Sequence, residues 1–130
     1  MTIGNAAFEE VIRPIPGLVA DGNLDTAQHH FVKISGDYKV AIAASDEMPI
    51  GVLCNKPLSG CAATIAGVGS TVKLVLGDTV VAGDKLCPDS SSGGTAVPAT
   101  TGDSTIAVAV IGGAVGDTIP AIIVGGLTVI

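Results

Sequence analysis

The chain is poor in aromatic residues, and this shortage narrows what it can bind. Its 130 residues include no Trp, one Tyr (Tyr38) and two Phe (Phe8 and Phe31). A carbohydrate- or peptide-binding surface would lack its usual stacking platforms, although a small β-rich ligand-binding module remains an alternative. The core must consist of Val, Ile, Leu and Ala, and such small and β-branched side chains suit thin pleated sheets better than helical bundles.

Positive charge and long apolar runs are also scarce. There are six Lys and Arg against twelve Asp and Glu, and residues 86–130 contain neither Lys nor Arg. Because nucleic-acid binding depends on basic residues at the phosphates, no nucleic-acid partner is expected. The longest uncharged run lies between Lys56 and Lys73, which is shorter than the roughly 20 apolar residues of a spanning helix. No membrane partner is expected, and residues 1–10 lack the features of a secretory signal.

The glycine-rich stretch 77-GDTVVAGDK-85 comes nearest to a nucleotide-binding motif. A phosphate loop requires a Lys directly after its last glycine, followed by a magnesium-binding Ser or Thr. Asp84 stands in the Lys position, and Leu86 follows Lys85. No nucleotide or other cofactor is therefore expected. We interpret Gly77-Asp78 and Gly83-Asp84 as turns, because glycine accepts positive φ and the Asp can bond to nearby backbone amides.

Cysteine and histidine are too few, and too poorly spaced, to predict a metal site. Cys54, Cys61 and Cys87 form no C-x-x-C pair, so we expect reduced, structural thiols. His29 and His30 are adjacent, and adjacent side chains on a strand point to opposite faces. No G-x-S-x-G nucleophile motif is present either. We therefore predict no catalytic residues and keep a hydrolytic enzyme only as the less favoured alternative.

What the chain does contain is a regular alternation of short apolar runs and turn residues. A hairpin is predicted from Ala27 to Ala44, with its turn at Ser35-Gly36-Asp37. Further strands are predicted at residues 50–54, 62–66, 71–76, 106–111, 121–124 and 127–130. Turn signals about every ten residues, without the period of an amphipathic helix, indicate an all-β fold with little helix, a small barrel or sandwich.

Residues 1–26 differ from the rest and are interpreted as an extended N-terminal arm, ahead of a domain at residues 27–130. Pro14 and Pro16 prevent a continuous helix and favour an extended path. The arm carries five large apolar residues: Ile3, Phe8, Val11, Ile12 and Ile15. These residues are too apolar for a tail that stays exposed to solvent, and they are predicted to contact a partner. The alternative is that they fold back as an edge strand of the domain.

Short motifs follow one another in a set order between Ala27 and Val124. They are Asp46–Leu53 (DEMPIGVL), Pro57–Gly60 (PLSG), Val72–Val75 (VKLV), Val81–Leu86 (VAGDKL), Ser92–Ala96 (SGGTA) and Gly116–Ile119 (GDTI). In this order they resemble the capsid decoration, or cement, proteins of tailed bacteriophages.

The resemblance implies a fold and a function. The fold would be a compact β-barrel or β-tulip-like domain, often a homotrimer. The function would be that of a structural virion protein on the outer surface of the assembled capsid, where it would stabilise the shell by clamping neighbouring subunits of the major capsid protein. Under this interpretation the arm residues Ile3, Phe8, Val11, Ile12 and Ile15 would bind the capsid. The family has no catalytic residues to carry over.

Overall fold

The structure is a computed structural model, and it describes residues 14–44, 47–89, 93–100 and 104–128. Within these ranges no residue is helical, so the predicted all-β fold is confirmed. The strands are β1 (Pro14–Ile15), β2 (Val19–Ala20), β3 (Phe31–Gly36), β4 (Lys39–Ile42), β5 (Gly51–Leu53), β6 (Ile65–Ala66), β7 (Thr71–Val75), β8 (Lys85–Pro88), β9 (Ala96–Pro98), β10 (Ser104–Ala109) and β11 (Thr118–Thr128). The described part of the chain contains no helix that could span a membrane.

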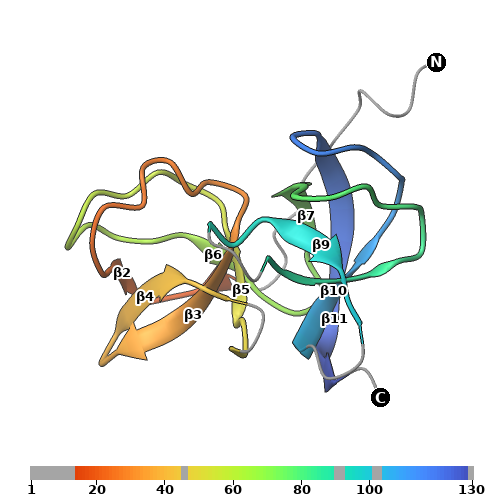
Figure 1. Cartoon of the computed structure of the whole chain (residues 1–130). Helices are drawn as coiled ribbons and strands as arrows, with labels where there is room; N and C mark the ends of the chain where they lie inside the picture. Colours follow the sequence, from red (N-terminus) through yellow and green to blue (C-terminus); the bar gives the residue numbers. More distant parts are fainter. Residues whose placement is uncertain (1–13, 45–46, 90–92, 101–103, 129–130) are drawn as a thin grey trace.

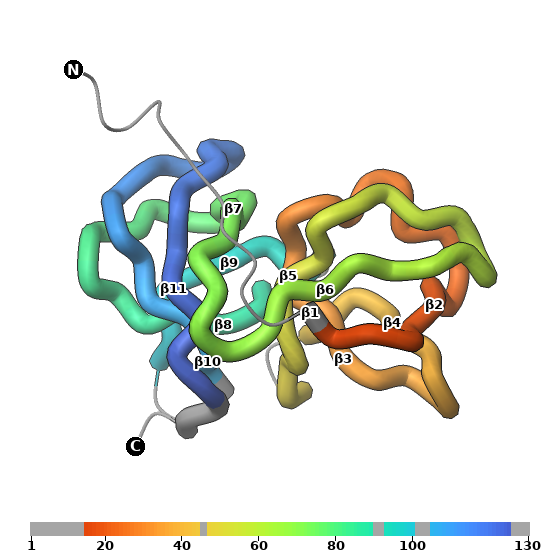
Figure 2. Tube along the Cα trace, turned by 180° about the vertical axis from the view of Figure 1, so that it is seen from behind, coloured from red at the N-terminus to blue at the C-terminus, as the bar shows by residue number. Residues whose placement is uncertain are grey.

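The strands form two sheets, and each sheet forms one lobe of the molecule (Figures 1 and 2). The N-lobe (residues 14–66) is a six-stranded sheet of order β1-β6-β5-β3-β4-β2, and the C-lobe (residues 71–128) is a five-stranded sheet of order β7-β11-β10-β8-β9. Single bridges lead back across each sheet. In the N-lobe Val19 of β2 is bridged to Ala62, just ahead of β6, and in the C-lobe Leu76, just after β7, is bridged to Ala96 of β9. Both sheets are therefore curled towards small barrels.

The two lobes repeat the same topology, mostly at a spacing of 56 residues. Val52 pairs with Ala66 in the N-lobe, and Val108 pairs with Ile122, each 56 positions later, in the C-lobe. Backbone hydrogen bonds at the lobe ends also correspond at this spacing. The bond from Gly60 N to Ala20 O (2.9 Å) in the N-lobe corresponds to the bond from Gly116 N to Leu76 O (2.8 Å) in the C-lobe. In the same way, the bond from Asp21 N to Val40 O (2.8 Å) corresponds to the bond from Gly77 N to Ala96 O (2.9 Å).

Two parts of the repeat depart from that spacing. β3 corresponds to β8 at a spacing of 54, since Phe31 pairs with Val52 as Lys85 pairs with Val108. β1 and β2 together correspond to the single strand β7. The chain is therefore a tandem of two equivalent β lobes, a division that the sequence did not indicate.

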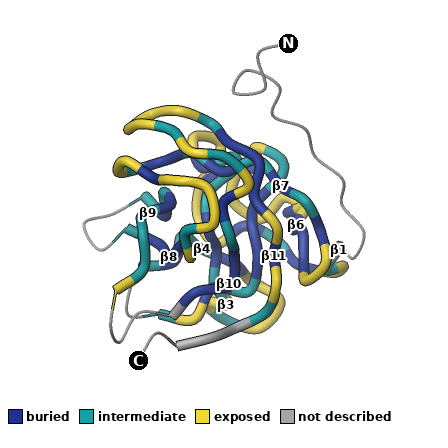
Figure 3. Tube along the Cα trace, turned by 90° about the vertical axis from the view of Figure 1, so that its right-hand side faces the viewer, coloured by how far each residue is buried: buried dark blue, intermediate teal, exposed yellow. Residues whose placement is uncertain are grey.

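The lobes share part of their hydrophobic core. One buried cluster, built on Val32, Val40, Leu53 and Ile65, belongs to the N-lobe alone. The other cluster fills the C-lobe and also includes Phe31, Val52 and Ala66 of the N-lobe, all fully buried. Burial follows the strands, while exposed residues gather in the connections between them (Figure 3). The outer face of β3, β5 and β6 is thus packed against the C-lobe.

The structure places the N-terminal part of the domain earlier than predicted. β1 pairs with β6 and β2 pairs in parallel with β4. Leu18, Ala20 and Leu24 are buried in the N-lobe core. Residues 14–26 therefore belong to the N-lobe instead of the predicted arm, because the short apolar run after Pro16 completes a barrel that would otherwise stay open. The arm remains a prediction for residues 1–13, which lie outside the described residues.

Other local predictions are confirmed or refined. The predicted hairpin is β3 and β4, but its turn is at Asp37 and Tyr38. The two predicted C-terminal strands are one strand, β11, and strands β8 and β9 were not predicted. The Gly83-Asp84 turn is confirmed: Gly83 has φ 89°, and the Asp84 carboxylate accepts the Val81 N–H at 3.0 Å.

Gly51 supplies a test of the packing between β5 and β6. A Cβ built at Gly51 would lie 2.2 Å from the Ala66 carbonyl oxygen, which is backbone and cannot move aside easily. We expect Gly51→Ala to lower the free energy of unfolding by about 1–3 kcal/mol, the usual cost of overpacking, as measured by urea denaturation. Gly36→Ala is the control, because its Cβ would meet only the Lys39 side chain at 3.6 Å. Equal stability of the two variants would contradict the described approach of β5 and β6.

The cysteines give a second test, because their burial differs. No disulfide joins them, and Cys61 is exposed, Cys54 is partly buried and Cys87 is buried. A thiol reagent should therefore modify Cys61 first in the native protein and Cys87 only on unfolding, as followed by mass spectrometry of digested samples. Cys87→Ser should lower the melting temperature more than Cys61→Ser, since a buried site loses packing and gains a polar atom. Early modification of Cys87 would show that the C-lobe core is wrongly described.

Candidate binding surface

The residues predicted from the sequence to bind a partner are mostly outside the described part. Ile3, Phe8, Val11 and Ile12 lie there, so the structure does not test them. Ile15 lies in β1 at one end of the six-stranded sheet and is partly buried against the N-lobe core. For Ile15 the structure supports the alternative of a folded edge strand.

The histidines lie where the two lobes meet. The His29 carbonyl oxygen accepts the Val75 N–H at 3.1 Å, and Nδ1 of His30 is hydrogen-bonded to the Gly93 carbonyl oxygen. Phe31 follows them and donates its N–H to the Gly94 carbonyl at 2.9 Å. This segment therefore ties the lobes together. Among the described residues, no group of three His, Cys, Asp or Glu side chains is placed to hold a metal ion.

The charged side chains that form ion pairs or hydrogen bonds stabilise local structure. Glu47 forms an ion pair with Lys33. The hydrogen bond from Lys33, and after it the bond from the Ala44 N–H, lowers the pKa of the Glu47 carboxyl. The carboxylates of Asp84 and Asp117 each accept a backbone N–H three residues earlier in the chain. Such contacts shape turns, and they leave these groups engaged with the protein itself.

An exposed apolar surface lies on the outer face of β10 and β11. Lys85, Val108, Ile122 and Thr71 form one row across four strands, because their backbones are paired in register. The side chain of Ile122 is 42% exposed, and Val110 and Val124 beside it are exposed as well. We call Lys85, Val108, Val110, Ile122 and Val124 the distal face. Contiguous exposed apolar residues of this kind, unlike scattered ones, indicate a binding surface.

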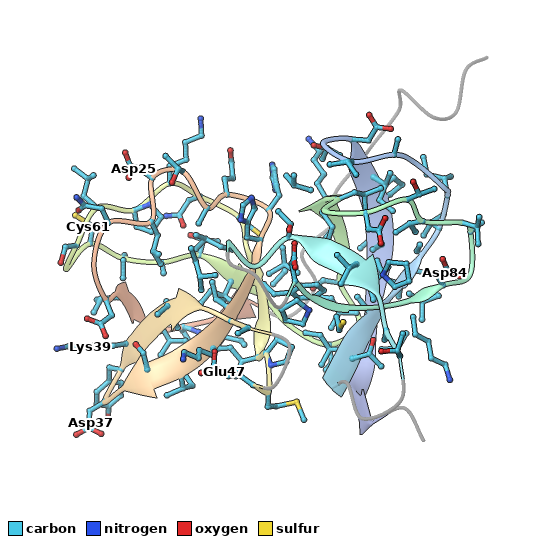
Figure 4. The ribbon with its side chains drawn as sticks, in the orientation of Figure 1. Asp25, Asp37, Lys39, Glu47, Cys61 and Asp84 are labelled. Carbon is cyan, nitrogen blue, oxygen red and sulfur yellow. The ribbon has the colours of Figure 1, made fainter. Side chains whose placement is uncertain are left out.

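A second exposed surface is the turn of the β3–β4 hairpin, at the far end of the N-lobe. It carries Asp37, Tyr38 and Lys39, which we call the hairpin tip. Tyr38 is the only tyrosine of the chain; it is 75% exposed and has φ 59°, an uncommon conformation for a large residue. Its carbonyl oxygen accepts the Val19 N–H at 2.9 Å, which fixes the turn. Figure 4 shows Asp37 and Lys39 at the opposite end of the molecule from Asp84, the neighbour of Lys85.

Sequence reasoning missed both surfaces. The signal for the distal face was available in β11, which carries Ile or Val on both faces (Ile119 and Ile123, Ile122 and Val124) where a half-exposed strand would alternate with polar residues. The sequence pattern did not indicate that Tyr38 is exposed, because this exposure depends on where the turn falls in the β3–β4 pairing.

The comparison with known proteins concerns the fold. The sequence matches no protein-family model and no curated protein. Among solved structures, the chain is similar to the head fibre gp8.5 N base of bacteriophage phi29, with a TM-score of 0.66 and 18% sequence identity. The similarity covers 91% of this chain and 92% of that chain. The two proteins therefore share a fold over most of the length of both chains.

Proposed function

We propose that this chain is a structural protein of a bacteriophage virion and binds the outer surface of the capsid. The observation that carries the proposal is the fold shared with a phage head fibre base over 91% of the chain. The order of short motifs between Ala27 and Val124 points independently to phage capsid decoration proteins. The acidic composition, the exposed apolar residues of the distal face and the exposed Tyr38 suit a protein that binds other proteins.

The proposed mechanism is binding without a chemical reaction, so that the protein is not an enzyme. Contacts to neighbouring subunits of the major capsid protein would stabilise the assembled shell, because a ligand that binds only the assembled state shifts the equilibrium towards it. A homotrimer would offer several such contacts at once, and linked contacts raise the overall affinity far above that of one site. Modest affinity per subunit is then sufficient.

Residues 1–13 are proposed as the part that attaches to the capsid. Four of their residues, Ile3, Phe8, Val11 and Ile12, are large and apolar. An apolar segment that becomes ordered on a partner buries this area at the moment of binding. Residues 14–66 form the described sheet of the N-lobe.

Deletion of residues 1–13 tests this role. We expect the circular-dichroism spectrum and melting temperature to stay unchanged, while co-sedimentation with capsids that lack this protein falls at least about tenfold, the equivalent of about 1.4 kcal/mol. A full-length variant with Ile3, Phe8, Val11 and Ile12 all replaced by Ser should show the same loss. Capsid binding equal to that of the intact chain would contradict the proposed attachment. Failure of the intact chain to bind any capsid would contradict the proposed function itself.

A further inference from the structure

We propose that Tyr38, in the hairpin tip, is a binding residue whose ring enters a pocket on a subunit of the major capsid protein. It would be a second contact beside the one made by residues 1–13. This inference rests on the proposed function, because it assigns a surface of the described domain to the same partner.

The backbone at Tyr38 has a conformation that suits glycine better than tyrosine. Its φ of 59° lies in the left-handed region, where the Cβ of an L-residue comes close to the following carbonyl oxygen and raises the free energy. Hairpin turns usually place Gly or Asn at such positions. The local fold therefore does not favour a tyrosine here.

Packing within the molecule does not offset this cost. The Tyr38 side chain is 75% exposed and belongs to neither hydrophobic cluster. Within the described ranges its hydroxyl forms no hydrogen bond. His29, the other non-glycine residue with a positive φ in these ranges, is held at the lobe junction by backbone bonds to Leu53 (2.7 Å) and Val75 (3.1 Å). An unfavourable conformation at an exposed residue that the core does not use is typical of a functional site.

The hairpin tip presents this ring from a fixed backbone. Gly36 of β3 pairs with Lys39 on one side of β4, and Val19 of β2 pairs with Lys39 on the other side. The Tyr38 carbonyl oxygen also accepts the Val19 N–H at 2.9 Å. Pairing on both sides of β4 thus sets the turn before any partner arrives, and a preorganised tyrosine loses little conformational entropy on binding.

The chemistry of the tip indicates the kind of surface it fits. A tyrosine ring offers a large apolar area that ends in a polar hydroxyl, and tyrosine is enriched among the residues that contribute most to protein–protein binding. Asp37 and Lys39 flank the ring with opposite charges, so the tip carries no net charge although the chain is acidic. The tip therefore suits a protein pocket with an apolar wall and a polar rim, and binding there should depend little on salt.

The position of the tip connects it with the proposed attachment segment. The described N-lobe begins at Pro14, and the chain runs along one edge of this lobe from β1 to β2 (Figure 2). Val19, which is bonded to Tyr38, lies five residues after Pro14, and five extended residues span at most roughly 18 Å. A capsid subunit that binds residues 1–13 is thus within reach of the tip. Two linked contacts raise the affinity above that of either one.

The test separates stability from binding. Tyr38→Asn removes the ring and keeps a residue that tolerates a positive φ. We expect its melting temperature to equal or exceed that of the intact chain. Its co-sedimentation with capsids that lack this protein should fall about tenfold, the equivalent of about 1.4 kcal/mol. A lower melting temperature, or capsid binding equal to that of the intact chain, would overturn the proposal.

Two further measurements identify the partner. Val115→Ser changes an apolar side chain that is 66% exposed in a C-lobe turn, and it should leave capsid binding unchanged; an equal loss in this control would overturn the role of the tip. Light scattering after gel filtration should give one oligomeric state for the intact chain and Tyr38→Asn, because a change would assign Tyr38 to a contact between copies instead. If the intact chain binds no capsid, the proposed function fails and this inference with it. If the intact chain and Tyr38→Asn bind equally well, only this inference fails.

Discussion

The packing of the N-lobe face on the C-lobe is the interaction on which the rest of the structure depends. Phe31 lies at its centre, with its side chain fully buried and both backbone groups bonded, the N–H to Gly94 and the carbonyl oxygen to the Ala43 N–H at 3.1 Å. Burying a Phe side chain contributes about 1.5–3 kcal/mol. Each lobe alone is a sheet of short strands with a core of Val, Leu, Ile and Ala. A domain as small as one lobe buries too little apolar surface to be more than marginally stable, so the shared core is needed to stabilise both lobes.

This arrangement also explains the distribution of exposed residues. The repeat gives both lobes an equivalent face, and among the described residues the N-lobe face is buried against the C-lobe whereas the C-lobe face is partly exposed. The C-lobe face carries the apolar residues Val108 and Ile122 and, in place of Phe31, the exposed Lys85. The hairpin tip, the counterpart of the Gly93–Gly94 segment, is exposed for the same reason. Tyr38 has a left-handed φ of 59°, and its carbonyl oxygen accepts the Val19 N–H.

The sequence predicted the class of fold but not its division into lobes. The strands near residues 50–54 and 71–76 and the Gly83-Asp84 turn were predicted because local alternation and turn chemistry decide them. β8 and β9 were missed because Pro88 and Pro98 interrupt the usual strand pattern, and their pairing comes from the lobe as a whole. The repeat was missed because equivalent positions have the same backbone hydrogen bonds but different residues. For example, Ala20 corresponds to Leu76, and Phe31 corresponds to Lys85. The predicted arm residue Ile15 is part of a strand, because its pairing with Ile65 depends on a distant segment.

Cryo-electron microscopy of the virion that contains this protein tests the central claim most directly. The account predicts density on the outer surface of the capsid that accommodates both lobes at full occupancy and contacts more than one subunit of the major capsid protein. Virions in which this protein lies inside the shell, or is absent from the particle, would contradict it.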